Sequence, residues 1–371
     1  MFPRLSYIEW FREQFGTVAH DLGSSDLGPE FEGVVPPRIA ELSDPDDDAT
    51  LESRIADLYG PSVDPANVLV TAGATQANLI AAATALGAWG DRVAVESPGY
   101  EPLVATPRGL GAGIDRVPRD PPRYELDPAA VADAIDERTG LVTVTNRHNP
   151  SGRPTPRERL DAVASVVADS GARLLVDEVY APFGTDPGTG PGTALGGPTA
   201  AGLDCAMATN SLTKFLGFDA LRTGWLVGPE DAVDRARTVE PHLLGPGEVN
   251  RRLAARVLAN RETLTEWSRR RLDENGALLA SFVEERDGLE GVAFPGSTFG
   301  FFAHRTASGD EVTRAALDAG VLVVPGRFFG RPERFRISLG GAPERMRDGL
   351  DALGTVLDSL PAGTGDDSSS S

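Results

Sequence analysis

The chain has 371 residues, of which 55 are acidic and 35 basic, so its formal net charge is −20. Apolar residues make up 40% of it, an ordinary globular share, and no stretch reaches the roughly 18 apolar residues that a membrane span requires. The acidic charge opposes binding to nucleic acid or to an anionic membrane. At about 150 residues per domain, the length predicts two or three domains.

The numbers of cysteine, histidine and charged residues bear on disulfides, metal binding and the environment of the protein. One cysteine, Cys205, excludes an internal disulfide framework, and four scattered histidines offer no metal cluster. The first fifteen residues have no separate basic and apolar regions, so we read no signal peptide and expect a cytoplasmic protein. A solvated acidic shell keeps halophilic proteins soluble, which suggests a salt-loving source; the alternative is a merely acidic enzyme.

Predicted strands and helices alternate up to about residue 230. The acidic run 43–50 is expected to be a solvated turn that caps a helix over 50–60, with Thr50 or Asp48 at its start. Apolar spacing predicts helices at 75–90 and 157–171. β-Branched apolar runs predict strands at 67–73, 91–99, 140–147, 172–180, 205–212 and 224–229. This order predicts an α/β fold with a mainly parallel sheet between helices, which binds ligands at the carboxyl ends of its strands.

The remaining chain predicts a second, smaller α/β unit. A Gly/Pro-rich loop at 185–202 precedes a long charged helix at about 249–287. A helix near 310–320 and strand signals at 291–305, 321–330 and 334–340 follow, and the low-complexity tail is predicted to be disordered. We therefore divide the chain into an N-terminal segment joining the small domain, a large domain, a connecting helix with the C-terminal small domain, and a tail: 1–45, 46–248, 249–361 and 362–371.

Lys214 is the only lysine among the 35 basic residues. Arginine can replace lysine as a surface charge, but it cannot form a Schiff base and does not lose its proton. A nucleophilic amine needs apolar or cationic neighbours, and Phe215 follows Lys214 directly. Ser211 and Arg222 lie three residues before and eight after it, which suits a bound phosphate.

Four other features are ambiguous when each is taken alone. Gly73-Ala74-Thr75 stands between a predicted strand and helix, where free N–H groups bind phosphate, although such turns are common. Asp177 and Tyr180 follow an apolar strand, where the aspartate could pair with a protonated pyridine nitrogen, cap a loop or bind Mg²⁺. Asn149 lies in Asn-Pro-Ser-Gly, which is also ordinary turn chemistry. Tyr100 could be an aromatic plate for a planar cofactor or merely a half-buried tyrosine.

Together these features resemble the fold-type I pyridoxal 5′-phosphate (PLP) enzymes of aminotransferase class I and II, from about residue 51 to 339. The residues that match the family's motifs are Ser211, Thr213, Lys214 and Arg222 in the lysine signature; Asn149, Pro150 and Gly152 in the Asn-Pro-x-Gly turn; Asp177 and Tyr180; and Pro325-Gly326 with Arg336-Ile337-Ser338. The joint pattern is specific, whereas each motif alone is not.

The resemblance implies a large PLP-binding domain with a seven-stranded sheet, a smaller α/β domain built from both chain ends, and a homodimer. It implies that Lys214 holds PLP as a Schiff base and moves the substrate proton, and that Asp177 pairs with the pyridine nitrogen. The other implied contacts are Asn149 and Tyr180 with the phenolic oxygen; Gly73, Ala74, Thr75, Ser211 and Arg222 with the phosphate; Tyr100 with the ring face; and Arg336 and Asn149 with the substrate, whose α-carboxylate Arg336 binds.

Two departures leave the substrate open. The family usually has a tyrosine that reaches the partner's phosphate, where this chain has the acidic segment 41–50. In place of a substrate-contacting glycine near the N-terminus, the chain offers Ser24 or Ser25. The expected activity is transfer of an amino group from an L-amino acid to a 2-oxo acid. The alternative is a PLP-dependent lyase, decarboxylase or cyclising enzyme.

Two readings outside this group of enzymes are discounted. A DNA-binding regulator would carry a basic DNA-binding module, and this chain has none. A nicotinamide enzyme would carry a dinucleotide fingerprint, but the run 109–113 lacks its last glycine, so we read that run as a turn.

His148 is expected to be a loop histidine satisfied by the backbone, and Cys205 a small core residue on a strand. Phe299, Phe301 and Phe302 are expected in the core of the small domain.

Overall fold

The computed structural model describes residues 1–27, 39, 41–185 and 192–360, and its larger part is built on a seven-stranded sheet. The strand order is β2-β8-β7-β6-β5-β3-β4, in which β8 runs antiparallel to both neighbours and all other pairs are parallel. The strands are β2 (Val68–Thr71), β3 (Arg92–Ser97), β4 (Gly113–Pro118), β5 (Thr139–Thr145), β6 (Arg173–Asp177), β7 (Ala206–Ser211) and β8 (Gly224–Val227). The α/β fold with a mainly parallel sheet is confirmed.

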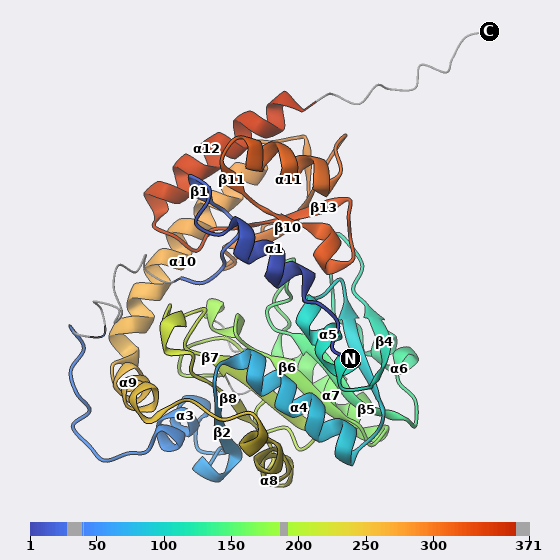
Figure 1. The fold of residues 1–371 in the computed structure, drawn as a ribbon, viewed down its shortest axis with the longest axis vertical. Coiled ribbons are helices and arrows are strands. Elements are labelled where there is room, and N and C mark those ends of the chain that lie inside the picture. Colours follow the sequence, from blue (N-terminus) through green and yellow to red (C-terminus); the bar gives the residue numbers. More distant parts are fainter. Residues whose placement is uncertain (28–38, 40, 186–191, 361–371) are drawn as a thin grey trace.

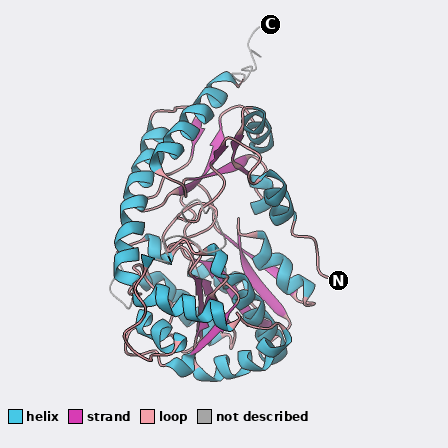
Figure 2. Cartoon of the chain, turned by 60° about the vertical axis from the view of Figure 1, so that its left-hand side comes forward, coloured by secondary structure: helices cyan, strands magenta, loops and turns pink. Residues whose placement is uncertain are grey.

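Helices cover both faces of this sheet because its strands alternate apolar side chains between the faces. Leu141 and Leu175 pack with α4, α5 and α8 on one face, while Val142 and Leu174 pack with α6 and α7 on the other. The helices are α3 (Leu51–Tyr59), α4 (Ala74–Ala88), α5 (Glu101–Gly109), α6 (Pro128–Ala134), α7 (Arg157–Asp169) and α8 (Glu230–Val239). Figure 2 shows the strands enclosed by these helices.

The predicted turn before α3 has the expected cap. The Thr50 side chain accepts the Ser53 N–H at 3.1 Å, so Thr50 rather than Asp48 is the N-cap residue, and the acidic run before it is mostly exposed. Residues 110–112 form the predicted turn between α5 and β4. No helix in the described residues combines the length and the apolar character needed to traverse a lipid bilayer.

A smaller part, at the top of Figure 1, combines residues 20–21 from near the N-terminus with the C-terminal segment of the described chain. Its four-stranded sheet has the order β12-β13-β10-β9, and β1 pairs in parallel with β11. Its strands are β1 (His20–Asp21), β9 (Leu289–Glu290), β10 (Phe299–His304), β11 (Val321–Leu322), β12 (Val324–Pro325) and β13 (Arg334–Ser338). Helices α11 (Gly309–Asp318) and α12 (Pro343–Ser359) pack on it. The domain boundaries stay predictions, and residues 361–371, with 186–191 of the Gly/Pro-rich loop, lie outside the described residues.

The single long helix predicted at about 249–287 is wrong, because the chain forms α9 (Glu248–Ala259) and α10 (Arg261–Glu284) with a break at Asn260. The Asn260 side chain donates to the Arg256 carbonyl at 2.8 Å and to the Ser43 carbonyl at 2.9 Å, and its backbone leaves the helical region. An asparagine that bonds to the backbone in this way competes with the helix. The helix α10 then runs from the large part to the small one (Figure 1).

The phenylalanine cluster is also distributed differently from the prediction. Phe302 packs in the core of the small part, but Phe299 and Phe301 point to the opposite side of β10. Phe299 packs against Tyr180, with ring centroids 4.7 Å apart, and so joins the core of the large part. Because neighbouring residues of a strand face opposite ways, three phenylalanines that are close in sequence serve different cores.

Helix α1 (Ser6–Gln14), which the sequence did not predict, lies between the large and small parts (Figure 1). The Glu101 carboxylate at the start of α5 accepts the N–H groups of Ser6 at 3.2 Å and Tyr7 at 2.7 Å. A carboxylate at this place satisfies free N–H groups at the helix N-terminus and complements its dipole. The ring of Tyr7 also packs against Phe328 and Phe329 from the small part, so α1 is held from both sides.

Candidate active site

A cavity of about 570 Å³ opens at the carboxyl ends of β5, β6 and β7 and is bordered by α1. This is the edge of the sheet at which parallel strands place their following loops. Its polar lining residues are Tyr7, Arg12, Ser25, Thr75, Asn78, Tyr100, Thr106, Thr145, Asn149, Asp177, Tyr180, Ser211, Thr213, Lys214, Asp219, Arg222 and Arg336. Its apolar lining residues are Leu5, Ile8, Phe11, Ala74, Pro102, Leu103 and Val179.

Lys214 reaches this cavity from the loop after β7. Its carbonyl accepts the Leu27 N–H at 2.8 Å, and Phe215 and Leu216 after it are buried in the core, so the backbone is fixed. Nζ lies 3.8 Å from Oδ1 of Asp26. Burial lowers the pKa of Lys214, but its electrostatic interactions with Tyr180 and Asp26 outweigh the burial, so the pKa lies above its usual value. In the described protein Lys214 is a fixed ammonium that faces a cavity.

Asp177 ends β6 and is buried in the cavity wall. Its carboxylate accepts Nδ2 of Asn78 at 2.8 Å and the Val179 N–H at 3.2 Å, and the described residues provide it with no ion pair. Burial raises the pKa of Asp177, although these two hydrogen bonds and the charge of Lys214 oppose the rise. A buried carboxylate without a cation is costly, so this one is suited to receive a cation from a ligand.

An anion-binding corner lies where β2 leads into α4. Gly73, with φ of +90°, occupies the N-cap position and offers no side-chain cap to the first N–H groups of the helix. A Cβ at Gly73 would stand 3.2 Å from Nη2 of Arg222, so glycine lets the guanidinium approach. Ser211, Ala74 and Thr75 line the same cavity. Free N–H groups, a helix dipole, a hydroxyl and an arginine together bind a phosphate.

A second anion-binding element is Arg336, which comes from β13 of the small part. Nη1 donates to Oδ1 of Asn149 at 2.8 Å, and Nη2 donates to the Gly23 carbonyl at 2.9 Å and to the Tyr7 hydroxyl at 3.2 Å. Nε is buried without a partner among the described residues. These contacts fix the guanidinium plane and leave the Nε–H and one N–H of Nη1 as donors, so a carboxylate bound as a planar fork would replace one of the contacts of Nη2.

Two tyrosines complete the wall. The Tyr180 hydroxyl lies 2.6 Å from Oγ of Ser25, and both side chains are buried. Tyr100 is half-buried, lines the cavity and packs against the Tyr7 ring at an interplanar angle of 82°, with centroids 5.8 Å apart. Burial is the main reason that the pKa of Tyr100 lies above its usual value, so its hydroxyl stays neutral.

The cavity therefore brings together ten of the eleven residues predicted from the sequence, and the eleventh, Gly73, lies next to the Arg222 guanidinium. Six polar lining residues were not predicted: Tyr7, Arg12, Asn78, Thr106, Thr145 and Asp219. Asn78 carried a signal, because it is an isolated polar residue on an otherwise apolar helix face. The structure also decides between the two serines, since Ser25 lines the cavity and Ser24 instead bonds to Asp21.

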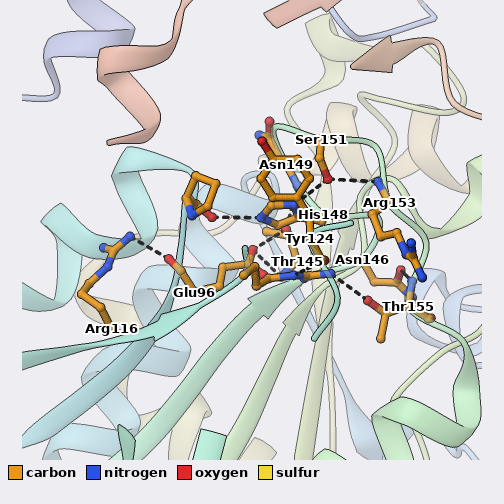
Figure 3. Close-up of polar contacts among 12 residues, drawn as sticks. Glu96, Arg116, Tyr124, Thr145, Asn146, His148, Asn149, Ser151, Arg153 and Thr155 are labelled. Carbon is orange, nitrogen blue, oxygen red and sulfur yellow. Dashed lines mark hydrogen bonds and ion pairs between the residues drawn. The ribbon is translucent and has the colours of Figure 1, made fainter. Parts of the chain in front are cut away.

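A buried polar network lies behind the cavity (Figure 3). Glu96 accepts from Arg119 at 2.7 Å and from the N–H and hydroxyl of Thr145, and the Thr145 hydroxyl accepts the Asn149 N–H at 2.9 Å. His148 lies in the same loop but does not line the cavity, and its Nε2 can only donate to the Pro98 carbonyl, 2.9 Å away. Burial holds the pKa of His148 well below its usual value. The backbone therefore satisfies Nε2 as predicted, whereas Nδ1 lies 2.7 Å from the Ser151 hydroxyl, a side-chain partner that was not predicted.

Comparisons with known proteins agree with this geometry. The family model described as "Aminotransferase class I and II" matches residues 36–353, and the chain belongs to this family. The chain is 32% identical over 235 residues to capreomycidine synthase of Streptomyces vinaceus, a match that covers 60% of this chain and 57% of that protein. It is 27% identical over 308 residues to the aspartate/prephenate aminotransferase of Thermus thermophilus, covering 80% and 77% of the two chains.

Among solved structures, a PLP-dependent aminotransferase from Streptococcus suis superposes with a TM-score of 0.85 at 23% identity, over 97% of this chain and 99% of that one. At this identity the likeness establishes the fold. The family uses PLP, and the groups of the cavity fit it: an amine, a buried carboxylate without an ion pair for a protonated ring nitrogen, and a glycine-lined corner for a phosphate.

Proposed function

We propose that this chain is an aminotransferase that moves an amino group from an L-amino acid to a 2-oxo acid, with PLP held on Lys214. The observation that carries the proposal is the shared cavity of a fixed lysine, the unpaired Asp177 carboxylate and the anion-binding corner at Gly73 and Arg222. When bound, PLP supplies an electron sink that weakens bonds at the substrate's Cα. The protein supplies orientation, charge and proton transfer.

Each residue then has a defined task. Asp177 keeps the ring nitrogen protonated, and Tyr180 and Asn149 donate to the ring's phenolic oxygen. Ser211 and Arg222, with the N–H groups at the start of α4, bind the phosphate. Tyr100 covers one ring face.

Substrate handling falls to two further groups. Arg336 binds the substrate's α-carboxylate and so sets which bond at Cα stands across the ring plane. When Lys214 Nζ is not bound to the cofactor, it moves the proton between the substrate's Cα and the cofactor. The apolar lining from α1 and α5 would help to exclude water.

The second candidate is a PLP-dependent lyase, decarboxylase or cyclising enzyme. The similarity to capreomycidine synthase favours it, because the match carries 32% identity, although it spans less than two thirds of that protein. Both candidates use the same cofactor-binding groups and differ in which bond breaks. Arg12 lines the cavity as an exposed cation without an ion pair among the described residues, and like charges repel, so it disfavours a substrate with a cationic side chain.

The test starts from the single lysine. Borohydride reduction of the PLP-loaded protein should add one pyridoxyl group, located on Lys214 by peptide mass. Lys214→Arg keeps the charge but cannot form the bond, so it should give no adduct and at least about 10³-fold less turnover. An adduct that persists in Lys214→Arg would contradict the proposal.

The reaction is then read from absorbance at high salt. A panel of L-amino acids should convert the yellow cofactor to its aminated form, and a 2-oxo acid should reverse the change. Release of carbon dioxide, ammonia or a cyclised product without a stable aminated form would favour the second candidate.

We also propose that the protein is a homodimer, as the family suggests, and that it is adapted to salt, as its net charge of −20 suggests. Light scattering tests the homodimer, and melting temperatures measured across KCl concentrations test the adaptation to salt.

A further inference from the structure

Ser25 stands on a loop that is fixed at several points. The Asp21 carboxylate accepts the N–H groups of Gly23 and Ser24 at 2.8 and 2.9 Å and also the Ser24 hydroxyl. The Gly23 carbonyl accepts from Arg336, and the Leu27 N–H donates to the carbonyl of Lys214. The loop is thereby tied to two residues of the site, and the position of the Ser25 hydroxyl is set by the backbone.

The 2.6 Å hydrogen bond between Ser25 Oγ and Tyr180 Oη has a defined donor once the Tyr180 hydroxyl donates its own proton to the cofactor. Either hydroxyl can donate in the contact as such. If Tyr180 uses its proton for the cofactor's phenolic oxygen, it can only accept from Ser25, so the serine must be the donor. Both hydroxyls are buried, where a chain of hydrogen bonds strengthens each member by about 10–30%.

We propose that Ser25 is a positioning residue that acts through Tyr180 and sets the proton equilibrium of the bound cofactor; this rests on the proposed function. Tyr180 and the proton shared with Lys214 Nζ compete for the same ring oxygen. A weaker donor at Tyr180 leaves that proton more tightly bound, so the titration midpoint of the cofactor's visible absorbance moves to higher pH. Loss of Ser25 should therefore raise the midpoint by about 0.2–0.5 pH unit.

The neighbouring serine provides a matched control. Ser25→Ala removes the hydroxyl bonded to Tyr180, whereas Ser24→Ala removes one bonded to Asp21 outside the cavity lining. The absorbance of each PLP-loaded variant is titrated from pH 5 to 10, and the melting temperature of each PLP-free variant is measured. Ser24→Ala should keep the wild-type midpoint. Ser25→Cys, which keeps a weak donor of similar shape, should shift the midpoint less than Ser25→Ala and in the same direction.

The double variant with Tyr180→Phe separates positioning from a general structural effect. Tyr180→Phe should raise the midpoint by about one pH unit or more, and Ser25→Ala added to it should change nothing further. A shift from Ser25→Ala that persists without the Tyr180 hydroxyl, or no shift beside a normal Tyr180→Phe effect, overturns the proposal. If the wild type itself gave no Lys214 adduct, the proposed function would fail instead, so the two failures are distinguishable.

Discussion

Nη1 of Arg336 donates a 2.8 Å hydrogen bond to Oδ1 of Asn149, which joins the small part of the molecule to the loop after β5. The amide has two ends. Its Oδ1 accepts the hydrogen bond from Arg336. Its Nδ2 has no acceptor among the described residues, so this group is available to donate to a ligand. One residue can therefore hold the arginine and donate to a cofactor oxygen at the same time.

Asn149→Asp should weaken amino acid binding strongly. The new carboxylate would pair with Arg336 in place of the substrate's carboxylate, and it would lose the amide's donor. A charge-assisted bond of about 1.5–3 kcal/mol corresponds to a rise of about 10- to 150-fold in the substrate Kd. The Kd is measured from the absorbance change of the loaded enzyme. Asn149→Ala, which adds no charge, should raise the Kd less; an equal effect of both variants would refute the competition.

Tyr7→Phe should raise KM about three- to tenfold and change kcat little, because the Tyr7 hydroxyl braces Arg336 at 3.2 Å and touches no reacting group in our assignment. Steady-state kinetics with a substrate of the panel measure both constants. Tyr124→Phe is the matched control, since the buried Tyr124 hydroxyl has no hydrogen-bond partner among the described residues and lies outside the cavity lining. A fall in kcat with constant KM in Tyr7→Phe would assign that hydroxyl a role in the chemical step.

The site residues at the carboxyl ends of the large sheet could be predicted from the sequence, because their positions follow from local patterns. Asp177, Asn149 and Lys214 each follow an apolar strand, and parallel strands bring their carboxyl ends to one edge. The turn at Gly73 is likewise a local signal, since a strand passes into a helix there. Such features need only the strand order to become a site.

The border formed by α1 could not be predicted in the same way. Tyr7 meets Arg336 across 329 positions of sequence, and nothing in the local pattern of α1 specifies that contact. The choice of Ser25 over Ser24 depends on the direction of a loop without regular periodicity. The break at Asn260 depends on a contact with the distant Ser43 carbonyl. In each case a tertiary contact, rather than propensity, decides the outcome.

Glu96→Gln should destabilise the protein by about 3–5 kcal/mol, because it leaves the Arg119 guanidinium buried with a weaker partner. Both side chains of this pair are fully buried, and burial raises the pKa of Glu96 and lowers that of Arg119 despite their mutual attraction. Urea unfolding measures the loss. Asp91→Asn breaks the exposed pair with Arg138 and should cost less than about 1 kcal/mol. Similar losses in the free energy of unfolding in both variants would contradict the claim that burial makes the Glu96–Arg119 pair the more costly one to break.

Glu178→Gln should flatten the dependence of stability on pH. Burial is the main cause that raises the pKa of Glu178 to about 8, against an ordinary value of 4.5. Between these values the folded state binds more protons than the unfolded state, so the contribution of Glu178 to stability is full below about 4.5 and is lost as the pH rises through about 8.

Glutamine imitates the protonated acid, because its oxygen can accept the Ala200 N–H and its amide can donate to the Thr199 hydroxyl. We therefore expect the variant to match the wild type near pH 5 and to exceed it in melting temperature at pH 8–9. The gain corresponds to a free energy of unfolding on the order of a few kcal/mol. Glu285→Gln, at the end of α10, is the control and should run parallel to the wild type. A Glu178→Gln curve parallel to the wild type would mean that Glu178 is already ionised at pH 5, and that Thr199 and Ala200 stabilise its charge more than burial opposes it.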